Sequence, residues 1–293
     1  MTFSPRLNQV QCLGARGLHR MAYWEWGDAV NPRVLVCAHG LARQARDFDT
    51  LAQAMSAEYR VVCVDVVGRG QSDWLADASG YQIPAYVADM VTLLARLNAK
   101  TLHWVGTSMG GLIGLGLASL PQSPIAKLVL NDVGPTIQFE ALVRIGTYLG
   151  QPLHWNTVDE AADYLHAISA SFGPHTREQW LALSRPMLKA DGHGLKLHYD
   201  PSIALPFKSI TPEIAAAGEA MTWAAFDAVR CPTLLLRGAD SDLLSRDTAR
   251  AMTTRGPKAR LVEFAGVGHA PTLVASDQVA AVREFLSEPQ ASP

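Results

Sequence analysis

The sequence lacks several features that would direct a protein into a membrane or onto a nucleic acid. No apolar run among the 293 residues approaches the roughly 18 needed to span a bilayer. Residues 1–6 contain no basic segment followed by an apolar stretch, so we expect no secretory signal peptide. Lysine and arginine form no cluster, and the formal net charge is −2 at pH 7. Nucleic acid and anionic membrane surfaces are therefore not expected as partners.

Cysteines and cofactor motifs are also scarce. The four cysteines lie far apart, at Cys12, Cys37, Cys63 and Cys231. They form no Cys-x-x-Cys pair, which argues against a metal site and favours reduced, buried thiols in a cytoplasmic protein. No Gly-x-Gly-x-x-Gly run occurs, and no lysine follows Gly68 and Gly70, so we expect no cofactor. The expected partner is a small-molecule substrate, bound by a monomer or a homodimer.

Short apolar runs alternate with longer segments of helical spacing. The runs cover residues 33–39, 60–65, 102–105, 127–130, 233–236 and 260–264. The helical segments include 48–55, 84–97, 112–120 and 279–286. Continuous apolar runs are typical of strands that are buried on both faces. The alternation predicts an α/β fold with a mostly parallel, doubly wound sheet of about eight strands.

The strand pattern stops after Asp132 and resumes near residue 231. Residues 134–225 contain helical stretches, many prolines and no convincing strand. We interpret them as an all-helical cap inserted into a core made of residues 1–133 and 226–293. Such a cap would cover the carboxyl edge of the sheet, where open α/β folds bind ligands. The large apolar side chains of the cap either line a substrate pocket or pack the cap on the core: Trp155, Tyr164, Phe172, Trp180, Met187 and Phe207.

One short segment carries the strongest chemical signal. Residues 106–110, Gly-Thr-Ser-Met-Gly, follow a predicted strand and open a predicted helix, which is the setting of a nucleophile elbow. Such a turn strains the backbone of Ser108 and exposes its hydroxyl, while Gly106 and Gly110 avoid clashes. A serine hydroxyl needs a base at neutral pH. His269, between the last strand and the last helix, is the best placed of the nine histidines.

Two backbone N–H groups are expected to form an oxyanion hole. In acyl transfer such donors must face the negative charge that develops on the carbonyl oxygen. We expect one from Met109, at a helix N-terminus where the helix dipole adds to it, and one from Leu41. Leu41 lies in the loop after His39, and we expect the His39 ring to hold that loop by hydrogen bonds.

Three carboxylates are candidates for the acid that orients the histidine. Asp132, Asp240 and Asp242 all follow strands at the appropriate edge of the sheet. Asp242, directly before an apolar turn, is the preferred prediction, and Asp132 and Asp240 are the alternatives. One carboxylate orienting the histidine while another holds the loop is also compatible with this spacing.

Together, these motifs resemble the α/β-hydrolase fold superfamily, and most closely its capped bacterial esterase-like serine hydrolases. The resemblance rests on chain order: His39-Gly40, the turn 65–73, the Ser108 elbow, the aspartates and His269. A serine at position 108 differs from haloalkane dehalogenases and epoxide hydrolases, which resemble this fold but use aspartate there. In many relatives the acid stands three residues after the glycine that ends its strand, a position that holds Ser241 in this sequence.

The sequence thus predicts a serine hydrolase that cleaves small to medium carboxylic esters through an acyl-enzyme intermediate. The same triad is compatible with hydrolysis of a carbon–carbon bond, a lactone or a thioester. A ligand-binding receptor that has kept the triad residues is the alternative from a different functional class.

Overall fold

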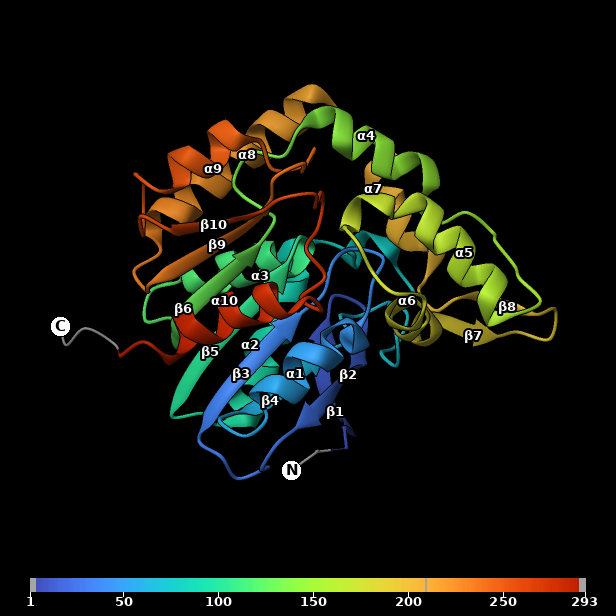
Figure 1. Ribbon diagram of the computed structural model, residues 1–293, viewed down its shortest axis with the longest axis horizontal. Helices are drawn as coiled ribbons and strands as arrows, with labels where there is room; N and C mark the ends of the chain where they lie inside the picture. The colour runs from blue at the N-terminus through green and yellow to red at the C-terminus, as the bar shows by residue number, and fades with distance from the viewer. Residues whose placement is uncertain (1–3, 209, 290–293) are drawn as a thin grey trace.

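The computed structural model describes residues 4–208 and 210–289. An eight-stranded sheet lies at its centre, in the order β1-β2-β4-β3-β5-β6-β9-β10 (Figure 1). Its strands are β1 (Arg6–Gly14), β2 (Gly17–Trp26), β3 (Arg33–Ala38), β4 (Arg60–Val64), β5 (Thr101–Thr107), β6 (Ile125–Asn131), β9 (Thr233–Gly238) and β10 (Arg260–Phe264). β2 runs antiparallel to both of its neighbours, and the other neighbouring pairs are parallel. The predicted fold class is confirmed, and all six apolar runs are strands.

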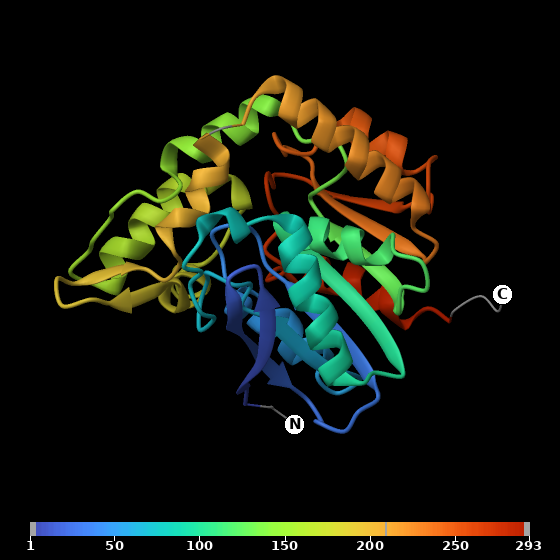
Figure 2. The same cartoon turned by 180° about the vertical axis from the view of Figure 1, so that it is seen from behind.

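The central strands are buried on both faces because helices cover both sides of the sheet. In β3, Val34 and Val36 belong to one hydrophobic cluster, whereas Leu35 and Cys37 belong to the other. This division follows from the alternation of side chains along a strand. Helices α1 (Asp49–Met55) and α10 (Ser276–Ser287) cover one face, seen in Figure 1. Helices α2 (Ile83–Leu97), α3 (Met109–Ala118) and α9 (Arg246–Met252) cover the other, seen from behind in Figure 2.

The cap is inserted between β6 and β9, above the carboxyl edge of the sheet. Its elements are α4 (Phe139–Tyr148), α5 (Val158–Ile168), α6 (Arg177–Ser184), β7 (Leu188–Ala190), β8 (Leu195–Leu197), α7 (Leu205–Lys208) and α8 (Pro212–Ala228). Since β7 and β8 pair as an antiparallel hairpin, the prediction of an all-helical cap is wrong. Strands of three residues are too short to produce a recognisable alternation in the sequence. The predicted boundary at 225/226 falls inside α8, whose Phe226 is buried in the core of the sheet domain.

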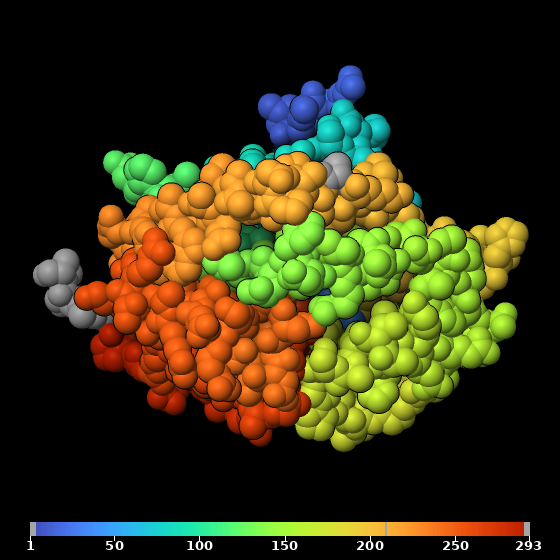
Figure 3. Space-filling model, turned by 90° about the horizontal axis from the view of Figure 1, so that it is seen from above, coloured from blue at the N-terminus to red at the C-terminus, as the bar shows by residue number. Residues whose placement is uncertain are grey.

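The cap is fastened to the turn that follows β4. The Gly70 N–H donates to His198 O at 3.0 Å, and the Asp200 N–H donates to Gly68 O at 2.8 Å. The Tyr81 hydroxyl donates to Asp200 Oδ2 at 2.5 Å. Seen from above in Figure 3, the segments from α4 to α8, coloured green to orange, cover much of this side of the molecule beside the orange-red segments that follow them, and a hollow lies between the green and the orange parts. Among the described residues, no helix combines the length and the hydropathy needed to cross a membrane.

The turn after β4 is organised by a buried carboxylate. Asp65 accepts from the Ala45 N–H at 2.8 Å and from the Gln71 N–H at 3.0 Å. Gly70 is required here because a Cβ would lie 2.3 Å from the Asp65 carboxyl carbon. Burial raises the pKa of Asp65 to about 6. The resulting turn lies beside the loop that carries Leu41, and therefore next to the candidate site.

Candidate active site

Ser108 occupies a strained turn between β5 and α3, with φ of 50° and ψ of −117°. Residues with a side chain rarely adopt this conformation, so the packing around it must hold it in place. A Cβ on Gly110 would lie 1.9 Å from Ala38 O, and one on Gly106 would lie 2.2 Å from Gly110 O. Both glycines are therefore needed for the close approach of α3 to the sheet, and the predicted strand, turn and helix are present.

His269 and Asp132 continue from Ser108 in one line of hydrogen bonds. His269 lies in the loop between β10 and α10, and its Nε2 is 3.0 Å from Ser108 Oγ. Its Nδ1 is 2.7 Å from Asp132 Oδ2. Asp132 follows β6 and is fully buried. A proton on Nδ1 that is held by this carboxylate leaves Nε2 free to accept the serine proton.

The loop after β9 fixes the Asp132 carboxylate from the other side. The Gly238 N–H donates to Asp132 Oδ1 at 2.8 Å, and the Ser241 hydroxyl donates to Oδ2 at 2.6 Å. Ser241 stands where many similar proteins carry the acid, and here it supports an acid supplied by the preceding strand. The carboxylate is therefore held by two protein donors in addition to His269.

The structure does not bring Asp242 to His269, so the preferred prediction for the acid is wrong. The Asp242 side chain forms an ion pair with Arg144 of cap helix α4 and is 53% exposed. Asp240 is also exposed. Ser241 turns inward between these two aspartates, which leaves Asp132 as the carboxylate in contact with the histidine.

The loop after β3 is arranged so that the Leu41 N–H points away from His39. The Val66 N–H donates to His39 Nε2 at 3.0 Å, so the proton of this ring is on Nδ1, which donates to Gly40 O at 2.7 Å. Burial lowers the pKa of His39 to about 3, which keeps the ring neutral. The C=O and N–H of one trans peptide point in opposite directions. With Gly40 O held by His39, the Leu41 N–H points the other way, and Leu41 and Ser108 both line one cavity.

Met109 is the first residue of α3, where the backbone N–H groups have no acceptor within the helix. Met109 lines the same cavity as Ser108 and Leu41. The two residues whose N–H groups are predicted to bind an oxyanion therefore line the same cavity as the serine. This arrangement can stabilise a negative charge that develops on a carbonyl oxygen held at Ser108.

Arg69, which the sequence analysis did not identify, contacts both Leu41 and Met109. It is fully buried, and its Nε donates to Leu41 O at 2.9 Å, while an Nη lies 3.6 Å from Met109 Sδ. Its other Nη donates to the Tyr86 hydroxyl at 2.9 Å. The two glycines that flank Arg69 gave a turn signal but no indication that the guanidinium is buried. Its contacts place a positive charge next to the predicted oxyanion donors.

Residues 35–282 match the model of the alpha/beta hydrolase family. This chain belongs to the alpha/beta hydrolase family. The 3-hydroxybutyrate-oligomer hydrolase of Cupriavidus necator is 57% identical over 291 residues, which cover 98% of this chain and 99% of that protein. The prediction that the chain is an enzyme of the hydrolase class is confirmed.

Two solved structures are similar to this member of the family along nearly the whole chain. An alpha/beta hydrolase from Novosphingobium aromaticivorans is 36% identical, with a TM-score of 0.82 over 96% of this chain and 98% of its own. A protein from Rickettsia typhi is 29% identical, with a TM-score of 0.87 over 98% of this chain and 100% of its own. The cap and the sheet domain therefore occur together in related hydrolases.

Two cavities of the hydrolase meet at Ser108. The larger, of about 1340 Å³, is lined mainly by apolar side chains from α3, the cap and residues 76–86, among them Leu112, Leu142 and Phe207. The smaller, of about 480 Å³, is lined by His269 and by mostly apolar cap residues, together with Arg144 and a few hydroxyl-bearing side chains. Leu41, Ser108 and Ile145 line both cavities. The serine therefore stands between two spaces, and an ester bond at Ser108 can have one substituent in each.

The apolar cap residues singled out in the sequence divide between pocket and packing. Phe207 lines the larger cavity, and Tyr164, Phe172 and Met187 line the smaller one. Trp180 packs inside the cap against a small cluster of its own. Trp155 contacts the Tyr164 ring at a centroid distance of 5.4 Å. Both expected roles therefore occur.

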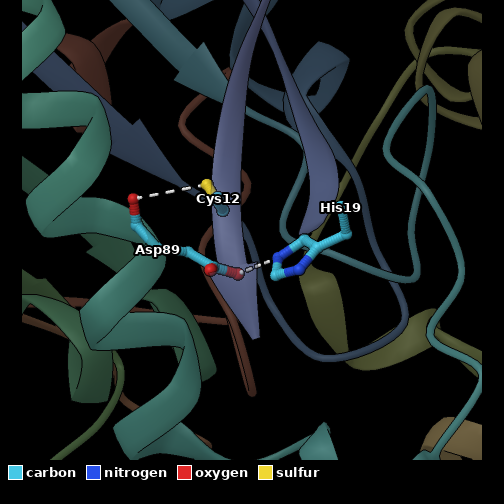
Figure 4. A group of neighbouring side chains, drawn as sticks. All are labelled: Cys12, His19 and Asp89. Atoms are coloured by element: carbon cyan, nitrogen blue, oxygen red, sulfur yellow. Dashed lines mark hydrogen bonds and ion pairs between the residues drawn. The ribbon is translucent and has the colours of Figure 1, made fainter. Parts of the chain in front are cut away.

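Another group of titratable side chains, formed by Cys12, His19 and Asp89, lies between the β1–β2 pair and α2 (Figure 4). Their candidate ligand atoms lie within 4.8 Å of one another. Spacing along the sequence missed this group because Cys12 and His19 face each other across the β1–β2 register. These residue types can bind zinc, and burial raises the pKa of the Cys12 thiol to about 12. With His19 Nε2 3.0 Å from Asp89 Oδ2, the group ties the strand pair to α2.

Proposed function

We propose that this protein hydrolyses the ester bonds of short 3-hydroxybutyrate oligomers through an acyl-enzyme on Ser108. The observation that carries the proposal is the hydrogen-bonded line from Ser108 through His269 to Asp132. The choice of substrate is supported by 57% identity to a 3-hydroxybutyrate-oligomer hydrolase. Two cavities that meet at the serine suit a substrate that extends on both sides of the cleaved bond.

In the acylation step, Ser108 Oγ attacks the ester carbonyl carbon while His269 Nε2 takes the hydroxyl proton. The carbonyl oxygen becomes an oxyanion, which the N–H groups of Met109 and Leu41 stabilise. Asp132 orients His269 and stabilises the imidazolium. Collapse of the intermediate breaks the bond to the alcohol oxygen, and His269 gives its proton to the departing alcohol.

In the deacylation step, a water molecule takes the place of the alcohol. His269 accepts one of its protons, and the hydroxide attacks the carbonyl of the acyl-enzyme through a second oxyanion. Collapse of this intermediate returns the proton to Ser108 Oγ and releases the carboxylic acid. Each proton that His269 accepts is therefore released within the same half-reaction.

The proposal is tested by comparing Ser108→Ala with the wild type on 3-hydroxybutyrate trimer and on p-nitrophenyl acetate. We expect kcat to fall by about 10⁶ for both substrates, as when other serine hydrolases lose the nucleophile. Ser119→Ala, at the opposite end of α3, is the matched control and is expected to behave like the wild type.

Equal turnover by Ser108→Ala and the wild type would rule out the serine mechanism. Turnover of p-nitrophenyl acetate without turnover of the trimer would reject the oligomer as substrate and leave the mechanism standing. A thioester and a lactone measured in the same assay distinguish ester cleavage from the other reactions open to this triad.

A further inference from the structure

The two cavities differ in their access to His269. His269 lines the smaller cavity together with Ser108, whereas Met109 lines the larger one. The alcohol that leaves Ser108 must take a proton from His269 Nε2. The alcohol part of the substrate therefore belongs in the smaller cavity, and the acyl part in the larger. This assignment rests on the proposed function and on which residues line each cavity.

The chemistry of a linear hydroxy-acid oligomer then determines what the smaller cavity must accept. In such an oligomer the first unit keeps a free hydroxyl, every later hydroxyl is esterified by the carboxyl group of the preceding unit, and the last unit ends in a free carboxylate. When an ester bond breaks, the leaving alcohol always carries this carboxylate. The smaller cavity therefore has to hold an anion, whereas the larger one holds an uncharged chain that ends in a hydroxyl.

The smaller cavity contains a cation suited to this task. Of its two lining arginines, Arg43 is already held by the Asp47 carboxylate through two hydrogen bonds of 2.7 Å. The side chain of Arg144 in α4 is 52% exposed, and its guanidinium forms an ion pair with Asp242, whose side chain is 53% exposed. Ion pairs as exposed as this contribute little, so a substrate carboxylate can replace Asp242 at small cost. A guanidinium can bind that carboxylate through two parallel hydrogen bonds.

The larger cavity provides a matched comparison. Its lining among the described residues includes one arginine, Arg16, which pairs with Asp77 at 3.2 Å and has a 77% exposed side chain. Each cavity thus has one exposed arginine–aspartate pair, and both cavities are otherwise lined mainly by apolar side chains. By the assignment above, the Arg144–Asp242 pair meets the alcohol part of the substrate, whereas the Arg16–Asp77 pair meets the acyl part.

We propose that Arg144 is a specificity residue that binds the terminal carboxylate of the leaving group in the smaller cavity. The enzyme therefore cleaves hydroxy-acid oligomers with the acyl chain in the larger cavity and releases the carboxylate-bearing fragment first. Asp242 forms an ion pair with Arg144 when no substrate is bound, and it competes with the substrate carboxylate for this guanidinium.

The first test compares a 3-hydroxybutyrate trimer with a free carboxylate and the methyl ester of the same trimer. Arg144→Met is expected to raise KM for the free acid roughly 10-fold, the loss of one charge-assisted contact, with little change in kcat. KM for the methyl ester is expected to stay within about 2-fold of the wild type, because that substrate lacks the anion. Arg16→Met is expected to change neither, and Asp242→Asn to lower KM for the free acid.

The second test does not depend on turnover of an oligomer. 3-Hydroxybutyrate is measured as a competitive inhibitor of p-nitrophenyl acetate hydrolysis, beside its uncharged methyl ester. The inhibition constant of the acid is expected to rise roughly 10-fold in Arg144→Met, while that of the methyl ester stays unchanged.

Three results would overturn the assignment: equal changes in Arg144→Met for the acid and the methyl ester, the carboxylate-specific effect in Arg16→Met, or no effect in either variant. If the wild type hydrolysed no oligomer at all, the proposed substrate would be rejected. The inhibition experiment would still decide whether Arg144 binds a hydroxy-acid carboxylate.

Discussion

Two supporting side chains at the carboxyl edge of the sheet, those of Asp132 and His39, are buried and held by backbone groups, whereas Arg144 of the cap meets the same site with an exposed side chain. Asp132 and His39 are both 0% exposed, and each accepts a hydrogen bond from a backbone N–H. On the cap, Arg144 is 52% exposed and pairs with a similarly exposed Asp242 from the loop after β9. The sheet holds its groups rigidly, while the cap presents groups that can exchange partners.

This contrast separates two tasks that an ester hydrolase must perform. Groups that touch reacting atoms need fixed geometry, because stabilising a developing charge depends on donors that are already in position. Groups that select a substrate need only interact favourably with it once it is bound, and their geometry in the free enzyme can vary. We therefore expect substitutions at the sheet edge to change kcat and substitutions in the cap to change KM.

The largest expected difference concerns the two aspartates. Asp132→Asn is expected to lower kcat by about 10⁴, because the amide no longer holds His269 in the required tautomer. Asp242→Asn is expected to leave kcat on p-nitrophenyl acetate within about 3-fold of the wild type, since exposed ion pairs contribute little. The measurement is steady-state kinetics, with circular dichroism to verify folding. A kcat loss in Asp242→Asn as large as that in Asp132→Asn would contradict the contrast between the buried carboxylate and the exposed one that pairs with the cap.

A second prediction concerns stability at low pH. His39 has an ordinary pKa of 6.5, and burial lowers it to about 3 in the folded protein. Between these values the unfolded chain binds more protons at this residue, so the free energy of unfolding must decrease as pH falls from 6.5 towards 3. One proton accounts for a slope of at most about 1.4 kcal/mol per pH unit.

The measurement for His39 is urea unfolding between pH 4 and 8 in His39→Gln and in His193→Gln, a control at an exposed cap residue. A glutamine amide can replace both hydrogen bonds of the His39 ring, so we expect it to fold and to lose this part of the slope. The pKa of Asp65 is raised to about 6, so its contribution to the pH slope of the free energy of unfolding has the opposite sign. We expect this contribution to be the same in every variant. Equal slopes in His39→Gln and the wild type would show that the ring is not held neutral.

The smallest expected effect concerns two neighbouring residues of α4. Leu142 lines the larger cavity, whereas Val143 is 47% exposed. Leu142→Trp is expected to lower kcat/KM for long-chain p-nitrophenyl esters roughly 3- to 10-fold by filling that cavity, with little change for the acetate. Val143→Trp is the control on the outer side. If both variants changed chain-length preference alike, the larger cavity would not hold the acyl chain.

Much of the sheet domain was predictable because its signals are local. The six apolar runs became strands, and residues 106–110 became the turn that holds Ser108. The hairpin β7–β8 was not predictable, since three-residue strands show no period. Arg69 was not recognised either, because burial of an arginine depends on what packs around its turn.

The sequence by itself determined the alternation of strands and helices, the elbow at Ser108 and the position of His269 after the last strand. These features arise from periodicity and turn chemistry within a few residues. Only the tertiary structure decided that Asp132 meets His269 across 137 residues of chain, and that Arg144 reaches the smaller cavity from the cap. Such contacts depend on how loops from separate strands turn towards one another, which no local pattern specifies.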